Sequence, residues 1–149
     1  MTMFTEMKFT DVRNNFTSVI DRVQNLSPVV VKPRKKSETY TFLLNKEWVK
    51  QLLQEVKIKV NMYPEEDGSL TLGIDELELY ANGDTKEKAF EELTEDLIQY
   101  AQDYMNEPHR YYNAPNRRHH LSYLFKILLC DNKDEVKQML LENAEIQGS

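Results

Sequence analysis

The hydrophobic positions of the first 56 residues change their spacing from helical to extended and back again. Between Thr10 and Gln24 they recur every three or four residues, which predicts an amphipathic helix with one buried stripe: Val12, Phe16, Val19, Ile20 and Val23. Thr10 can cap this helix, and Asp11 suits the positive end of its dipole. Residues 25–28 end the helix, and the β-branched run at 29–31 predicts a strand.

A basic turn separates this strand from a second one. Residues 32–37 read KPRKKS, and alternate residues then form one face of the returning strand: Tyr40, Phe42 and Leu44. Asn45 can cap a further helix with an apolar side: Trp48, Val49, Leu52, Leu53 and Val56. A unit of this size is marginally stable alone. We therefore expect it to complete its core by pairing with a second copy around a two-fold axis.

Strict alternation of apolar and polar residues begins after residue 56. Ile58, Val60 and Met62 alternate with polar residues and predict a half-buried strand. The Asp67-Gly68 step predicts a hairpin turn, and two further strands are expected around 70–74 and 77–81. Asp84 and Glu87 then have the spacing of a capping box at the start of a long helix. The pattern predicts a three-stranded antiparallel sheet plus a long helix.

The last 43 residues are predicted to be a C-terminal helical segment. Residues 106–116 include two prolines and are expected to form a linker. Helices are expected at 117–130 and 134–143, and the chain from Ala144 onward is expected to be frayed. The fold class is therefore α+β, in three parts: 1–55, 56–106 and 107–149.

Composition excludes some classes of protein. The chain has 149 residues, of which 40% are hydrophobic and 30% charged, as in a globular protein. No apolar run approaches the ~20 residues of a membrane span, and the first residues lack the apolar core of a signal peptide. Cys130 is the single cysteine, which excludes an intramolecular disulfide and a cysteine-based zinc site. A cytoplasmic location is expected.

The net charge of −6 is distributed unevenly. Residues 1–60 carry 11 Lys/Arg and 6 Asp/Glu, whereas residues 61–107 carry 2 Lys against 14 Asp/Glu. Residues 108–149 are nearly balanced, with 6 basic and 5 acidic side chains. This split indicates a basic and an acidic partner-facing region. Two solvated surfaces that merely differ in charge are the alternative.

The N-terminal residues resemble the DNA-binding domain of Phd/YefM-type antitoxins. The resemblance rests on the ordered runs MKFTDVRNNFTSVIDR, SPVVVKPR and TYTFLLNKEWVKQLL. It implies a dimerisation and DNA-binding domain that contacts palindromic operator DNA. The implied DNA-binding residues are Thr10, Arg13, Asn15, Lys32, Arg34, Lys35 and Lys36. Arginine can recognise guanine through two hydrogen bonds, and clustered lysines neutralise phosphates. Pro33 stands where the family usually has an arginine, so that contact has either moved to Arg34 or been lost. A solvated hairpin tip is the alternative.

The middle segment resembles HicB-type antitoxin domains. The resemblance rests on DGSLTLGI followed by ANGDTKEKAFEEL, although the connection between the second and third strands is shorter than in that family. It implies a partial ribonuclease-H-like fold and a module that docks a toxin. An acidic segment would attract a toxin that cleaves RNA, because such a toxin needs a basic surface.

Catalysis and metal binding find little support in the sequence. Asp67, Asp75 and Glu76 lie near strand ends. Asp67 suits its turn for backbone reasons, and the adjacent Asp75 and Glu76 would point to opposite faces of a strand. No further carboxylate has a convincing spacing for a nuclease. His119 and His120 are neighbours on an expected helix and point about 100° apart, so they cannot easily share one ion. No enzyme, cofactor or metal is expected.

These inferences favour an antitoxin of a type II toxin–antitoxin system. It is expected to bind a small basic ribonuclease toxin, RelE-like or HicA-like, to repress its own operon and to form a homodimer or a higher even oligomer. A stand-alone transcription regulator and a protein-interaction adaptor without a toxin are the alternatives.

Overall fold

The computed structural model describes residues 1–147 and consists of two compact units, Met1–Leu52 and the chain from Leu53 onward. The sequence analysis divides this part of the chain at residue 106. In the structure, residues on both sides of that boundary lie in the second unit and share its core. The fold class is α+β, as predicted, with one mixed sheet in each unit.

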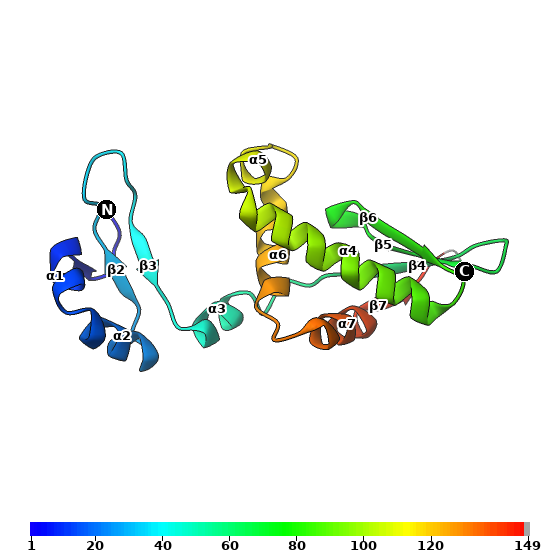
Figure 1. Cartoon of the computed structure of the whole chain (residues 1–149), viewed down its shortest axis with the longest axis horizontal. Coiled ribbons are helices and arrows are strands. Elements are labelled where there is room, and N and C mark those ends of the chain that lie inside the picture. The colour runs from blue at the N-terminus through cyan, green and yellow to red at the C-terminus, as the bar shows by residue number, and fades with distance from the viewer. Residues whose placement is uncertain (148–149) are drawn as a thin grey trace. The chain divides into compact units, whose positions relative to one another are not determined.

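The first unit is a small three-stranded sheet with short helices (Figure 1). The elements in chain order are β1 (Glu6–Met7), α1 (Phe9–Asn14), α2 (Phe16–Gln24), β2 (Val29–Val31), β3 (Thr41–Leu43) and α3 (Lys46–Leu52). The central strand β2 pairs in parallel with β1 and antiparallel with β3. Its three valines are buried, because a strand flanked on both edges suits β-branched side chains. The predicted order of helical segment, strand, basic turn, strand and helix is thus confirmed.

The single helix predicted over residues 10–24 is in fact two helices. The chain leaves helical geometry at Asn15, where φ is −126°, and α2 begins at the next residue. As a result, Val12, Val19 and Val23 are buried, but Phe16 is 53% exposed. The predicted cap is also wrong: α1 already starts at Phe9, with Lys8 before it. Asn45, in contrast, does cap α3, since its Oδ1 accepts from the N–H of Glu47 (2.8 Å).

The sheet of the second unit has four strands rather than the three predicted. Their spatial order is β6 (Leu79–Gly83), β5 (Leu70–Ile74), β4 (Val60–Pro64) and β7 (Ala144–Ile146). The first three form the expected antiparallel meander, with Gly68 at φ +86° in the hairpin turn. β7 pairs in parallel with β4, Val60 opposite Ala144. The expectation of a frayed end from Ala144 is wrong for the described residues, because their backbone groups complete an otherwise unpaired sheet edge.

Six helical elements complete the second unit. They are η1 (Asp75–Leu77), α4 (Lys86–Asn106), α5 (Pro108–Tyr112), η2 (Arg118–His120), α6 (Leu121–Leu128) and α7 (Lys133–Glu142). The long helix is confirmed, but its cap is Thr85, whose hydroxyl accepts from the N–H of Lys88 (3.2 Å), and not Asp84. The segment expected to be a linker contains α5, which starts with Pro108 at a position that suits proline.

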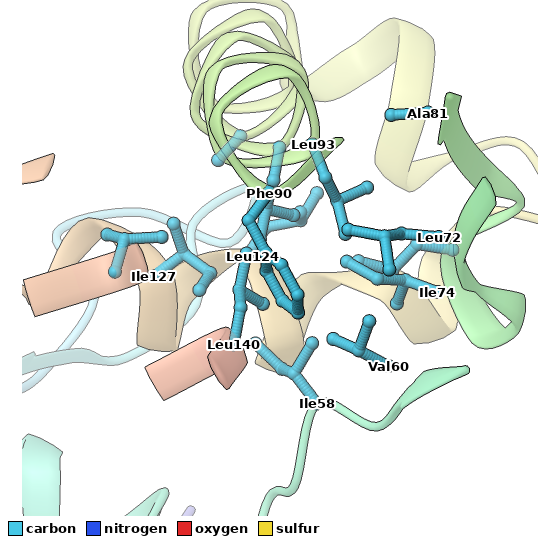
Figure 2. Close-up of a cluster of buried hydrophobic side chains, with 14 of the residues drawn as sticks. Ile58, Val60, Leu72, Ile74, Ala81, Phe90, Leu93, Leu124, Ile127 and Leu140 are labelled. Atoms are coloured by element: carbon cyan, nitrogen blue, oxygen red, sulfur yellow. The ribbon is translucent and has the colours of Figure 1, made fainter. Parts of the chain in front are cut away.

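The core of the second unit lies between α4 and one face of the sheet, and α6 and α7 close its sides (Figure 2). Phe90 and Leu93 of α4 point toward Leu72 and Ile74 of β5. Leu124 and Leu140 add apolar surface from α6 and α7. Each of these residues has 1% or less of its surface exposed, so burial of apolar area holds these elements together.

Candidate nucleic-acid and partner surfaces

A cation–π contact joins the basic loop between β2 and β3 to α1. The guanidinium of Arg34 lies 5.1 Å from the centroid of the Phe9 ring, and its Nε donates to Glu38 (3.0 Å). The backbone N–H of Arg34 also donates to the same carboxylate (3.1 Å). Glu38 raises the pKa of Arg34, through the hydrogen bond first and charge second. Arg34 therefore orders the loop against the first turn of α1.

This contact brings Arg13 and the basic loop to the same surface of the unit. Phe9 and Arg13 are four residues apart on α1, so their side chains project from the same face of that helix. Arg34 packs on that face through Phe9. Arg13 is exposed, as are Lys32, Lys35 and Lys36. We name these five basic residues, Arg34 included, the basic surface.

The remaining two predicted DNA-binding residues lie on the same helix. Thr10 is exposed on α1. Asn15 stands at the junction with α2, where its Nδ2 donates to the carbonyl of Asp11 (2.9 Å). Its side chain therefore has a local structural use.

The first unit exposes large apolar side chains. Phe4 and Phe42 make an edge-to-face contact (5.5 Å between centroids), and each is about half exposed. Phe16, Trp48 and Leu52 are also exposed, the last by 68%. Isolated exposed apolar residues are normal, but this number on 52 residues is typical of a surface that is covered by a partner.

In the second unit, two lysines of α7 neutralise part of the acidic surface of α4. Lys133 Nζ forms ion pairs with Glu91 and Glu95, the latter at 2.8 Å, and Lys137 pairs with Glu91 at 3.2 Å. These partners raise the pKa of Lys133 and lower that of Glu91. Glu92, exposed on the same helix, adds to the acidic surface.

His120 is buried within a polar and aromatic cluster between α4 and η2. Its Nδ1 lies 2.6 Å from the hydroxyl of Tyr100, which also accepts from Arg117 Nη1 (3.2 Å). Tyr104 donates to the carbonyl of Arg117 (2.8 Å). Burial lowers the pKa of His120, and the charges of His119 and Arg117 lower it further. This arrangement holds the chain after α5 against α4.

Sequence reasoning missed a second polar cluster, around Asp75. Asn61 Nδ2 donates to Asp75 Oδ2 (2.6 Å), Tyr80 donates to Oδ1 (3.0 Å), and the hydroxyl of Tyr63 lies 3.4 Å from Oδ2. Asn61 and Tyr63 belong to β4, Tyr80 to β6 and Asp75 to η1, so their proximity depends on the register of the sheet. The polar positions within the alternating strands were the signal that could have found them.

The carboxylates considered for a nuclease do not assemble. Asp67 accepts from the N–H and the hydroxyl of Ser69 in its own turn (2.9 and 2.5 Å), whereas Asp75 binds the cluster described above. Within residues 1–147, no group of three or more His, Cys, Asp or Glu could hold a metal ion. None of the described helices combines the length and apolar character that a membrane span requires.

The matches to known proteins cover both units of the chain. A model of the PHD_like family, described as "Antitoxin of toxin-antitoxin, RelE / RelB, TA system", matches residues 3–142. A crystal structure from Syntrophomonas wolfei subsp. wolfei, described as the antitoxin part of a candidate toxin/antitoxin system, is 37% identical. It superimposes with a TM-score of 0.84 over 96% of this chain and 99% of that one. Curated proteins gave no match.

Such coverage defines the class of protein as an antitoxin of a toxin–antitoxin system. The chain belongs to the PHD_like antitoxin family.

Proposed function

We propose that this antitoxin is a non-enzymatic, cytoplasmic protein that binds operator DNA with its first unit and a ribonuclease toxin with its second. The observation that carries the proposal is the basic surface, where α1 and the β2–β3 loop meet through Phe9 and Arg34. An exposed arginine beside exposed lysines offers one group for base recognition and others for phosphates. The antitoxin family supplies the functional context.

The exposed apolar residues of the first unit support a homodimer. A second copy that covers Phe16, Trp48 or the Phe4–Phe42 pair would bury surface that the isolated unit leaves in water. Two copies related by a two-fold axis present two basic surfaces, which matches the symmetry of a palindromic operator. We therefore propose a Phd/YefM-like dimer for the first unit.

The DNA-binding half is tested with the promoter fragment of the chain's own operon. Arg13→Ala and Lys35→Ala are expected to weaken binding about tenfold or more, and the log-log slope against salt should become shallower for Lys35→Ala. Lys50→Ala is the matched control, because Lys50 is exposed on α3, at the end of β3 opposite to the basic loop. Equal affinity for promoter and random DNA would contradict operator recognition.

The toxin-binding half is tested with the protein encoded beside this chain. That protein should be a RelE-like or HicA-like basic ribonuclease that arrests growth alone and co-purifies with the antitoxin, whose co-expression restores growth. The acidic surface of the second unit, in a segment of 2 Lys and 14 Asp/Glu, supports this assignment because it would compete with the toxin's RNA substrate. An adjacent product that neither binds nor arrests growth would favour the stand-alone regulator instead.

A further inference from the structure

The four-stranded sheet has one face in the core and one face at the surface. Val60, Leu72, Ile74 and Ala81 point into the core, so the alternate residues of the same strands form the outward face. This outward face consists of Asn61, Tyr63, Thr71, Gly73, Tyr80, Asn82 and Glu145. Tyr80 is its most prominent aromatic residue, 55% exposed.

Glycine at position 73 allows the Tyr80 ring to lie across the neighbouring strand. Gly73 and Tyr80 are direct cross-strand partners, and a Cβ atom on Gly73 would stand 2.6 Å from Tyr80 Cε1. At its other end, the ring is held by the hydrogen bond from its hydroxyl to Asp75 (3.0 Å). The ring is therefore fixed at both ends before any partner arrives, which lowers the entropic cost of binding to it.

The charged side chains of the strands around this ring are mostly negative; Lys59, just before β4, pairs with Glu145 of the same face at 3.5 Å. The segment 60–83, which contains β4, β5, β6 and their connections, has six acidic residues and no lysine or arginine: Glu65, Glu66, Asp67, Asp75, Glu76 and Glu78. A fixed tyrosine ring beside a carboxylate is the combination that attracts a guanidinium, through the ring face and through charge.

We propose that the outward face of this sheet, centred on Tyr80 and Asp75, receives an arginine of a basic partner protein. The inference rests on the proposed function, in which that partner is the toxin. Nucleic acid also stacks on tyrosine rings, but its phosphates would be repelled by the six acidic residues of segment 60–83. The charge of the face therefore selects a basic protein over RNA.

The test measures binding of the full chain to the protein encoded beside it, by calorimetry. Tyr80→Ala is expected to weaken binding about tenfold or more, as for an aromatic residue at the centre of an interface. Tyr80→Phe should have a smaller effect, because it keeps the ring and loses only the bond to Asp75. Gly73→Ala keeps Tyr80 but forces its ring off the strand, and should approach the effect of Tyr80→Ala. Tyr112→Ala is the control, an exposed tyrosine on α5.

The outcomes separate the inference from the function on which it rests. If the wild-type chain does not bind the adjacent product, the proposed function fails. If the wild-type chain binds and Tyr80→Ala and Gly73→Ala bind equally well, only the present inference is overturned. It is also overturned if Tyr80→Ala changes the oligomeric state of the free chain or abolishes binding of single-stranded RNA. Binding weakened about tenfold or more by Tyr80→Ala and Gly73→Ala, with unchanged circular dichroism, supports it.

Discussion

The two units differ in how much of their apolar surface they bury by themselves. Met7 and Leu43 are partly buried against the core of the first unit, whose buried residues are valines: Val12, Val19, Val23, Val29 and Val31. The core of the second unit has 16 buried residues, among them Phe90 and Tyr104. Aromatic and leucine side chains bury more area than valine, so burial within the unit stabilises the second unit more than the first. The first unit instead leaves large apolar residues exposed, which is the observation behind the proposed dimer.

The largest effect is expected from a cavity in the core of the second unit. Phe90→Ala removes a ring that is 1% exposed and should lower the free energy of unfolding by about 3–5 kcal/mol. Urea unfolding followed by far-ultraviolet circular dichroism measures it. Glu92→Ala, exposed on the same helix, should change little. A small effect of Phe90→Ala would show that the core of the second unit is less tightly packed than its buried side chains indicate.

A smaller effect is expected where the second unit begins. Lys126 Nζ donates to the carbonyls of Leu53, Gln54 and Val56, at 3.2, 3.4 and 2.6 Å. Lys126→Met keeps most of the aliphatic stem but leaves these carbonyls without their cation, at a cost of about 1–3 kcal/mol. Limited proteolysis should then cut more rapidly at residues 53–56. Unchanged cleavage would show that other contacts hold this segment.

Dilution should change the stability of the first unit more than that of the second. Trp48 is the single tryptophan and lies in the first unit, so its fluorescence reports unfolding there. If a second copy stabilises this unit, tenfold dilution should lower its apparent stability by about 1.4 kcal/mol, because assembly follows mass action. The far-ultraviolet circular dichroism, to which the longer helices of the second unit contribute most, should move less. A fluorescence midpoint that is independent of concentration would contradict the dimer.

Sequence patterns predicted the elements that have long or regular repeats. They failed for elements that depend on contacts between residues far apart in the sequence. The apolar stripe of α4 and the alternation of β4 and β5 are local, and both elements were found. β7 has three residues, and only its pairing with β4 makes it a strand. The break at Asn15 was not predicted, because the apolar residues keep their helical spacing in the sequence on both sides of it.

The candidate sites show the same division. The four basic residues at 32–36 could be grouped because they are close in sequence, and the resemblance to antitoxins added Arg13 and a DNA-binding role that stays a prediction. The cluster of Asn61, Asp75 and Tyr80 was missed, because strand register brings together residues that lie 14 and 5 positions apart. A single sequence contains no direct signal for that register.

The smallest predicted effect is a pH dependence confined to the second unit. Burial lowers the pKa of His120 below its usual 6.5, while an unfolded histidine keeps the usual value. Below pH 6.5 the unfolded chain therefore binds a proton that the folded chain resists, so stability should fall as the pH drops from 6.5 toward 5 and stay level above 6.5. Urea midpoints from pH 5 to 8 test this. His120→Gln should flatten the slope, whereas His119→Gln, exposed beside it, should keep most of it. An equal slope in both variants would assign the pH dependence to other groups.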